Sequence, residues 1–451
     1  MQTDVLIIGG GPAGIVTALT ARKVYPSKKI VLVRQNKTAV IPCGIPYIFH
    51  RLQGVDQDTI SDEVLTNNNI DLIIDKVLSI DVDNKKALLE QGVDNDKEIV
   101  FDRLVFATGS KPVKIPIPGI DKQGVWFVRK DADYLKQLRQ AVLQSKNVVI
   151  IGGGFIGVEI AEELSNVEGL NIHVVEKLPH CLLTSFDEEF ALQAEGLLKS
   201  KGVNIHTNVS VESIDGGERL TSVKLSDGTV LQADVVIVSI GPRPNIDLAL
   251  KAGLKIGDYK AITVDEFMRT NIDYIFAVGD CCEKKDFFTR KAKPVMLAST
   301  ACHEARIAGH NLYALTLHST TGTIAAFSTF VNGTVFSSVG LTEQEAKRLN
   351  MEVVSTTVEV PNHHPGKLPG TKLIKLKALF SKTGVLMGVQ LSGPETVAEL
   401  VNLISLAIQK ELTVFDLLQL QVATHPLITP APTVYPLIKA AQSVINRFES
   451  V

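Results

Sequence analysis

Cysteine is scarce in this sequence, with five among 451 residues, an odd number without regular spacing. A disulfide framework is therefore not expected. Scattered thiols are typical of a reducing compartment, here the cytoplasm, where a reactive cysteine is catalytic. No pair has the C-x-x-C spacing of a metal site, so we expect no bound metal.

Long apolar runs and an excess of one charge are also missing. No stretch reaches about 18 uninterrupted apolar residues, because residues 148–164 are broken by glycines and then by acids. The N-terminal residues lack the basic leader and cleavage site of a secretory signal. Basic and acidic residues number 46 and 49, and no Lys/Arg cluster forms a stripe. We therefore expect no membrane span, no nucleic-acid partner and a small-molecule substrate.

Two segments of the chain share one design. Residues 4–22 (DVLIIGGGPAGIVTALTAR) and 147–164 (NVVIIGGGFIGVEIAEEL) each contain a short apolar run, a glycine turn and a helical pattern. Such a segment is the start of a βαβ unit. The sequence therefore predicts an α/β protein with two Rossmann-like nucleotide-binding domains.

The pattern changes from about Gly322 onward. Asn332-Gly333 predicts a hairpin, because this pair readily takes the positive φ values of a tight turn. Residues 342–350 have a helical pattern, and three alternating strand patterns and a second helical segment at 397–410 follow. This region is predicted to be an α+β domain.

The glycines of both turns follow the pattern G-x-G-x-x-G directly after a predicted strand. The first glycine makes the tight turn, the second lets the backbone approach a pyrophosphate, and the third permits helix–strand packing. The anion would lie at the helix N-terminus. Two such signatures predict two dinucleotides, bound by Gly9, Gly11 and Gly14 and by Gly152, Gly154 and Gly157.

The strands that follow the two turns end differently. Glu176, 24 residues beyond Gly152, can accept a hydrogen bond from the ribose 2′-OH of NADH and would repel the 2′-phosphate of NADPH. Lys177, the next residue, carries a positive charge that weakens this preference, so NADPH is the alternative. The first unit has Arg34 and Gln35 at this place. Either Gln35 serves the ribose or the first nucleotide is held in another way.

One cysteine, Cys43, lies between Pro42 and Pro46 in a predicted turn. Pro46 is suited to the first turn of a helix, and Cys43 would then lie at its positive end, where the pKa of a thiol falls. We expect a reactive thiol, and the alternative is a buried packing cysteine. The other cysteines are expected to be structural: Cys181, Cys281, Cys282 and Cys302.

These features resemble the single-cysteine branch of the pyridine nucleotide-disulfide oxidoreductases. That branch contains coenzyme A disulfide reductases, NADH oxidases, NADH peroxidases and sulfur or persulfide reductases. The resemblance covers nearly the whole chain and rests on GGGPAG (9–14), PCGIPY (42–47), ATGSKP (107–112), GGGFIGVE (152–159), GPRPN (241–245), FAVGD (276–280) and FSSVGLTEQEAK (336–347).

The resemblance implies three domains and their cofactors. Residues 1–112 and 243–320 would bind FAD, residues 113–242 would bind NAD(P)H, and residues 321–451 would form a homodimer. Roles carried over by position are the FAD pyrophosphate for the first glycine turn, the flavin nucleotide for Thr108 and Gly109, the ribityl chain for Asp280, and a place near the nicotinamide for Glu159.

The expected sulfur chemistry depends on the absence of a second cysteine close to Cys43 in the sequence. Two-cysteine relatives carry a second cysteine five residues away, whereas Thr38 and Ile48 stand at these positions here. The oxidised form would be a mixed disulfide with coenzyme A, a persulfide or a sulfenic acid. Pro12 replaces the histidine of the peroxidases, which disfavours peroxide reduction. Tyrosines of the coenzyme A disulfide reductases are replaced too, so the proton donors would be His363, His364, His425 or Tyr435.

We therefore expect an FAD enzyme that uses NADH to reduce a disulfide, persulfide or polysulfide through Cys43, with coenzyme A forms first. Two alternatives stay open: an NADH oxidase that reduces oxygen, and a non-enzymatic flavin-based redox sensor. Coenzyme A is a candidate ligand because basic residues flank the first helix, although a solvated face also explains Arg22, Lys23, Lys28 and Lys29.

Overall fold

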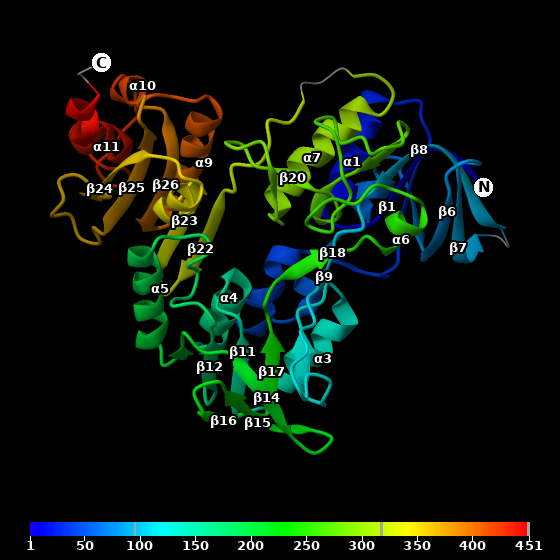
Figure 1. The fold of residues 1–451 in the computed structure, drawn as a ribbon, viewed down its shortest axis with the longest axis horizontal. Coiled ribbons are helices and arrows are strands. Elements are labelled where there is room, and N and C mark those ends of the chain that lie inside the picture. Colours follow the sequence, from blue (N-terminus) through cyan, green and yellow to red (C-terminus); the bar gives the residue numbers. More distant parts are fainter. Residues whose placement is uncertain (94–95, 316–318, 449–451) are drawn as a thin grey trace. The chain divides into compact units, whose positions relative to one another are not determined.

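The computed structural model describes residues 1–93, 96–315 and 319–448 and divides the chain into two compact units (Figure 1). The first unit comprises residues 1–116, 126–144 and 240–323. The second comprises residues 117–125, 145–239 and 324–451. Among the described residues, no helix combines the length and apolar character needed to cross a bilayer.

The first unit is built on a parallel sheet whose strands are buried on both faces. Along β1, Val5 and Ile7 join one apolar core and Leu6 and Ile8 join another. This pattern is typical of a parallel sheet covered on both sides. The sheet contains β5 (Asp71–Ile74), β2 (Ile30–Arg34), β1 (Gln2–Ile8), β8 (Asp96–Phe106) and β19 (Ile275–Ala277), and continues from β8 into antiparallel β7 (Lys86–Val93) and β6 (Val77–Asp81).

Two helices of the first unit pack against each other beside this sheet. Figure 1 shows α1 (Pro12–Val24) next to α7 (Ala298–Asn311). Their close approach depends on Gly309, where a Cβ atom would lie 2.7 Å from the Thr20 Cβ. The register pairs Phe106 with both Ile8 and Ala277. The loops after β1, β8 and β19 therefore leave the sheet at one edge.

The second unit starts with another parallel sheet, in the order β17 (Val235–Val238), β11 (Asn147–Ile151), β12 (Asn171–Val175) and β13 (Asn204–His206). The helix α4 (Phe155–Leu164) follows β11 directly, as the second glycine signature predicts. A small antiparallel sheet is formed by β14 (Val211–Gly216), β15 (Leu220–Leu225) and β16 (Val230–Gln232).

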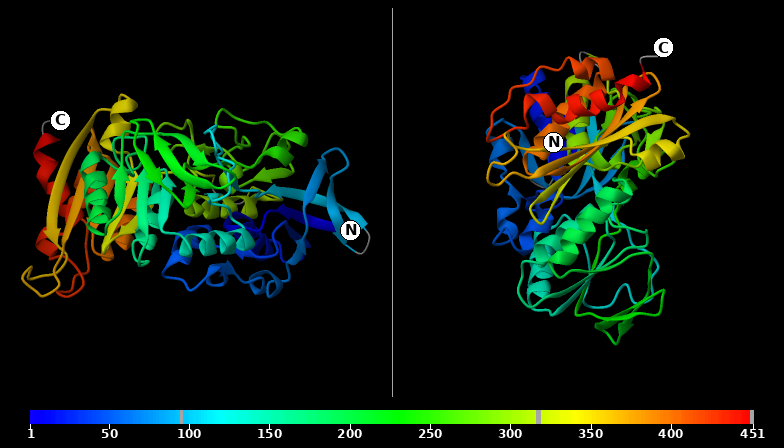
Figure 2. Two further views of the ribbon diagram at one scale, coloured as in Figure 1. Left: turned by 90° about the horizontal axis from the view of Figure 1, so that it is seen from below. Right: turned by 90° about the vertical axis from the view of Figure 1, so that its left-hand side faces the viewer.

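The C-terminal part of the second unit is a five-stranded antiparallel sheet with helices. The predicted hairpin is confirmed, with φ of 43° at Asn332 and 79° at Gly333. Figure 2 shows α11 (Pro436–Val444, red) on this sheet, where it packs on β24 and β25, and α9 (Thr396–Gln409) packs on β23 and β26. The strand order is β22 (Phe327–Val331), β23 (Thr334–Gly340), β26 (Leu386–Gly393), β25 (Leu373–Ser381) and β24 (Val353–Pro361). The predicted fold class, two Rossmann-like domains and an α+β domain, is confirmed.

A buried lysine connects this antiparallel sheet with the start of α5 (Glu188–Ser200). Lys377 is 5% exposed, and its Nζ lies 2.9 Å from Asp187 Oδ2 and 2.7 Å from Glu189 Oε1. It also lies 2.8 Å from Glu343 Oε2. The Gln390 amide donates to Asp187 Oδ2 over 2.6 Å. Because three carboxylates share this one ammonium group, Lys377 links the start of α5 to the sheet.

Candidate active site

The first glycine turn has the geometry that its signature predicts. Gly9 has φ of +121°, and a Cβ atom there would lie 2.0 Å from the Ala107 carbonyl oxygen. At Gly14 a Cβ atom would lie 1.9 Å from the Gly9 carbonyl oxygen. Gly11, by contrast, has φ of −81° and no atom within 4 Å of a built Cβ. The first and third glycines are therefore required by the fold, and the second leaves open space.

The second glycine turn repeats this division. Gly152 has φ of +110°, and a Cβ atom at Gly157 would lie 1.9 Å from the Gly152 carbonyl oxygen. Gly154 has φ of −74° and open space around a built Cβ. In both turns the open position is the N-cap residue of the helix that follows, where free N–H groups suit a phosphate. The residues present therefore fit a dinucleotide pyrophosphate at each turn.

The open space at Gly154 and the close backbone contact at Gly157 predict different effects of alanine at these two positions. Alanine at Gly154 is expected to leave the stability of the apoprotein within about 0.5 kcal/mol and to raise the KM for NADH at least about tenfold, because the methyl group takes the space of the pyrophosphate. Gly157→Ala, the matched control, should lower the melting temperature, since its Cβ meets backbone. An unchanged KM in Gly154→Ala would show that the open space does not receive the nucleotide.

Residues 107–112 and 278–280 meet the first glycine turn at the same edge of the sheet. The Thr108 hydroxyl donates to the Asn245 carbonyl over 2.7 Å, and Asn245 N donates to the Gly109 carbonyl over 2.9 Å. Asp280 Oδ2 accepts from Ser110 Oγ over 2.7 Å. The structure thus brings together predicted site residues from three distant segments of the sequence: Gly9, Thr108 with Gly109, and Asp280.

A lysine that the sequence did not single out also reaches Asp280. Lys130 Nζ lies 3.0 Å from Asp280 Oδ2. Burial opposes ionisation of this carboxyl, but Lys130 and the Ser110 hydroxyl outweigh the burial and lower its pKa. Asp280 is therefore a carboxylate, and both of its oxygens can accept hydrogen bonds. Lys130 follows Arg129 in a loop between elements, and no sequence pattern marks either residue.

Buried charges hold the loop that carries Asp280. Lys284 and Glu304 are each 4% exposed, with 3.2 Å between Lys284 Nζ and Glu304 Oε2. Gly279 N donates to the same Glu304 oxygen over 2.9 Å, and Lys284 donates to the Cys282 carbonyl over 3.0 Å. Burial raises the pKa of Cys282, and also that of Cys281. The expectation that these two cysteines are structural agrees with their burial.

The end of β2 explains why no acid stands at position 34. Arg34 is 6% exposed and pairs with both carboxylate oxygens of Asp62, over 2.5 and 2.7 Å. Its Cδ would be 2.6 Å from a Cβ built at Gly10, so the side chain lies along the first glycine turn. Gln35 follows as an exposed residue. Its contact with the ribose therefore stays a prediction.

Cys43 is exposed and lies in the first turn of a short 3-10 helix, η1 (Pro42–Phe49). The prediction that this helix starts at Pro46 was wrong, because Pro42 already occupies its first position and Pro46 lies inside it. Ile41 precedes it in an extended conformation, and Gly44 N donates to the Ile41 carbonyl over 2.9 Å. Although the helix starts earlier than predicted, Cys43 still lies at its N-terminal, positive end.

Two carboxylates lie near the second glycine turn. Gly153 N donates to Glu176 Oε2 over 2.6 Å, and Leu178 N donates to Glu176 Oε1 over 2.7 Å. Glu159 accepts from the Thr329 hydroxyl of β22 over 2.8 Å. Burial, with a smaller contribution from Glu163, raises the pKa of Glu159 to about 7.

The raised pKa of Glu159 makes the stability of the protein depend on pH. A carboxyl that is harder to ionise in the folded chain destabilises that chain as pH rises from about 4.5 to about 7. We expect apo Glu159→Gln to be more stable than the natural protein at pH 8, by up to about 3 kcal/mol, and nearly equal at pH 5. Melting temperatures at both pH values would measure this, with exposed Glu168→Gln as control. Equal or lower stability of Glu159→Gln at pH 8 would contradict it.

Three of the predicted proton donors lie on two loops of the second unit that contact each other. His364 N donates to the Pro426 carbonyl over 3.0 Å, and His364 Nδ1 lies 3.1 Å from the Thr429 carbonyl oxygen. His363 and His425 belong to the same two loops. Tyr435 lies at the start of α11, and among the described residues no hydrogen bond joins its phenol to either loop.

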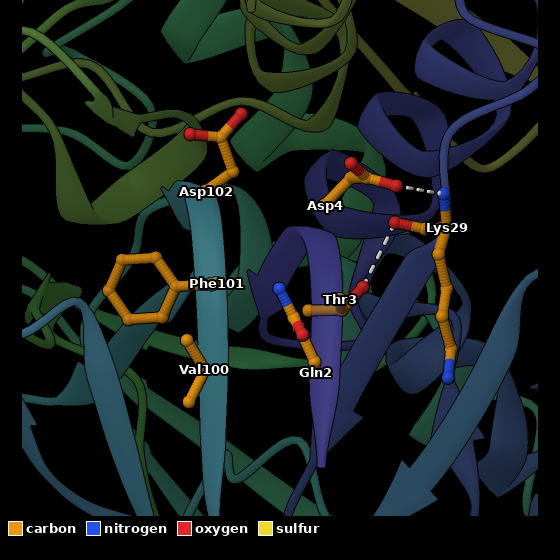
Figure 3. A pocket seen from close by; sticks show the side chains of 7 residues that line it. All are labelled: Gln2, Thr3, Asp4, Lys29, Val100, Phe101 and Asp102. Carbon is orange, nitrogen blue, oxygen red and sulfur yellow. Dashed lines mark hydrogen bonds between the residues drawn. The ribbon is translucent and has the colours of Figure 1, made fainter.

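An open hollow of about 540 Å³ lies elsewhere in the first unit, at the N-terminal end of β1 (Figure 3). In it Thr3 Oγ1 donates to the Lys29 carbonyl over 2.9 Å, and Lys29 N donates to Asp4 Oδ2 over 2.7 Å. The glycine turn follows the other end of this strand. The hollow is therefore not the predicted nucleotide site.

Comparisons with known proteins identify both parts of the chain. Residues 3–305 match the family described as pyridine nucleotide-disulphide oxidoreductase, and residues 327–434 match its dimerisation domain. An NADH oxidase from Methanocaldococcus jannaschii is 32% identical over 461 residues, covering 99% of both chains. An NAD(P)H coenzyme A polysulfide/persulfide reductase from Pyrococcus horikoshii is 31% identical, covering 88% of both.

A solved structure is similar over the whole chain. The NAD-dependent persulfide reductase from A. fulgidus has a TM-score of 0.91 and 31% identity, and the match covers 100% of this chain and 84% of that one. The two family matches together span most of the sequence. The chain therefore belongs to the pyridine nucleotide-disulphide oxidoreductase family, as an enzyme that uses FAD and NAD(P)H.

Proposed function

We propose that this enzyme uses NADH to reduce a disulfide, persulfide or polysulfide, with coenzyme A forms first, through the single redox cysteine Cys43. The observation that carries the proposal is the exposed thiol of Cys43 at the start of η1. Cys281 and Cys282 of the same unit are buried. An accessible thiol with a stabilised thiolate suits exchange with an external sulfur compound.

Cys43 would react with its sulfur substrate by thiol–disulfide exchange. A sulfur compound R–S–S–R′ and the Cys43 thiolate form the mixed disulfide Cys43–S–S–R and release R′S⁻. FAD would supply to this disulfide, when bound, the two electrons that it takes from NADH. The S–S bond breaks, the Cys43 thiolate is restored, and RS⁻ takes up a proton. The proton donors that we propose are His363, His364, His425 and Tyr435.

The geometry of each unit supports the cofactor roles that the family resemblance implies. We assign the FAD pyrophosphate to Gly9, Gly11 and Gly14, with Thr108, Gly109 and Gln35 along the nucleotide and Asp280 at the ribityl chain. The NADH pyrophosphate is assigned to Gly152, Gly154 and Gly157. Glu176 would hold the ribose, which favours NADH over NADPH, and Glu159 would lie near the nicotinamide.

Assembly and location complete the proposal. The match of residues 327–434 to a dimerisation domain supports a homodimer. The five thiols, none of which forms a disulfide in this structure, support a reducing compartment, which we take to be the cytoplasm.

A second candidate function is reduction of oxygen by NADH. The NADH oxidase of M. jannaschii, with its match over 99% of both chains, favours it. In this reaction Cys43 would cycle through a sulfenic acid. A flavin-based redox sensor without turnover is the third alternative.

Anaerobic stopped-flow mixing separates these functions. The holoenzyme is reduced by NADH and then mixed with coenzyme A disulfide, polysulfide or oxygen, while flavin absorbance is followed. Fast reoxidation by sulfur compounds alone is the expected result. Fast reoxidation by oxygen alone would establish the oxidase, and reoxidation by none of them would establish the sensor. Mass analysis of the purified protein for a coenzyme A or extra-sulfur adduct on Cys43 is an independent check.

A further inference from the structure

A buried carboxyl group lies directly against the turn that carries Cys43. The Asp58 side chain is 1% exposed, and a Cβ atom built at Gly44 would lie 1.8 Å from its Oδ1. The carboxyl group therefore fills the space that a side chain at position 44 would take, one residue after Cys43. Asp58 Oδ2 has no hydrogen-bond partner in the part of the chain that the structure describes.

The backbone fixes Asp58 in this place. The strands β3 (Ala39–Val40) and β4 (Thr59–Ile60) are antiparallel, and they enclose the segment between them from both ends. Ile41 N donates to the Asp58 carbonyl over 3.0 Å, and Asp58 N donates to the Val55 carbonyl over 2.9 Å. These backbone hydrogen bonds hold the main chain in place on both sides of the contact between Asp58 and Gly44.

The charges around this carboxyl group have other partners. Asp56 of η2 (Val55–Gln57) is exposed and lies 2.7 Å from Lys136 Nζ of α3 (Ala132–Leu143). Arg139 of α3 donates to the Ile48 carbonyl over 2.7 Å. Burial raises the pKa of Asp58 to about 6. The titratable groups on the surrounding elements are Cys43 and Tyr47 on η1, Asp56 on η2, and Asp133, Tyr134, Lys136 and Arg139 on α3.

A buried carboxyl group without a full set of partners lowers stability, so packing alone does not explain it. The Asp58 carboxyl group lies against Gly44, which is bonded directly to Cys43. Two acidic groups held close together on one turn disfavour each other's ionised form, because each negative charge repels the other. They then titrate as a coupled pair.

We propose that Asp58 is a positioning residue that sets the protonation state of Cys43, through sharing of one proton between the carboxyl group and the thiol. The balanced exchange is Cys43–SH + Asp58–COO⁻ to Cys43–S⁻ + Asp58–COOH, with no electron transferred. The inference rests on the proposed function only because that function makes Cys43 the reactive thiol. A neutral Asp58 therefore permits the thiolate, and an ionised Asp58 holds the proton on sulfur.

The test measures the reactivity of Cys43 in the full-length, FAD-loaded protein. Iodoacetamide is added at a series of pH values, and mass spectrometry follows alkylation of the Cys43 peptide. Asp58→Asn, which keeps the shape and removes the charge, is expected to react about tenfold faster at pH 7, with its pH profile shifted to lower pH. Asp56→Asn removes an exposed charge from η2 and should leave the profile unchanged. Identical profiles for Asp58→Asn and the natural protein would overturn the proposal.

A second measurement does not depend on folding of the variant. In the natural protein, coupled titration should give the alkylation profile two steps, and a profile that fits one ionisation would overturn the proposal. Neither measurement uses an electron acceptor. If stopped-flow mixing showed oxygen to be the only acceptor, the sulfur-reductase function would fail while the Asp58 result would stand by itself.

Discussion

Cys43→Ser is expected to lower turnover of coenzyme A disulfide, persulfide and polysulfide by about a thousandfold or more, since a hydroxyl cannot form the mixed disulfide. The substitution removes no packed side chain, because Cys43 is exposed. The fold and the two glycine turns should therefore be unaffected. Reduction of FAD by NADH should also proceed at nearly its natural rate.

The measurement is steady-state turnover under anaerobic conditions, with flavin reduction followed separately. Cys302→Ser is a suitable control, because this cysteine lies on α7 of the same unit and is only partly buried. It should retain natural turnover. Sulfur-acceptor turnover that is unchanged in Cys43→Ser would remove the basis of the proposed function, whereas a loss of oxygen turnover alone would favour the oxidase.

Glu304→Gln is expected to destabilise the first unit by about 3–5 kcal/mol, because it leaves the Lys284 ammonium group buried without a carboxylate. The change is nearly isosteric, so cavities do not contribute. The Glu304 oxygen also accepts from Gly279 N, directly before Asp280. We therefore expect weaker retention of FAD together with the lower stability.

Urea unfolding of the apoprotein and the fraction of FAD retained after gel filtration would measure both effects. The double variant Glu304→Gln/Lys284→Met removes both charges and is expected to recover much of the lost stability. If the double variant were as unstable as the sum of two single variants, the pair would not be coupled. Glu283→Gln, next to Lys284 but outside the pair, is the control for a changed charge.

The sequence predicted the parts of the fold whose signals are local. The glycine turns, the hairpin at Asn332-Gly333 and the strands after it all follow from short patterns, and the structure has them at the expected places. The start of η1 was missed, because Pro42 and Pro46 both suit a first helical position and the pattern did not distinguish them.

The charged clusters could not be predicted in this way. Lys377 occupies a strand with alternating polarity, where a lysine is normally expected to face water, but its partners come from residues nearly 200 positions earlier and from α8 (Glu343–Arg348). Asp58 is likewise one of many acids in a polar loop. Only the tertiary contacts show that both are buried, since no short pattern records which distant residue packs on which.

The Thr329–Glu159 hydrogen bond and the Lys377 cluster both cross from the antiparallel sheet to the elements beside the second glycine turn. Deleting the C-terminal third would therefore strip Glu159 of its hydroxyl donor and leave Asp187 at the start of α5 without its cation and its amide. A shortened chain that ends before β22 would therefore not fold into a stable, independent form of the enzyme. The region that matches a dimerisation domain therefore also stabilises, within one subunit, the elements beside the second glycine turn.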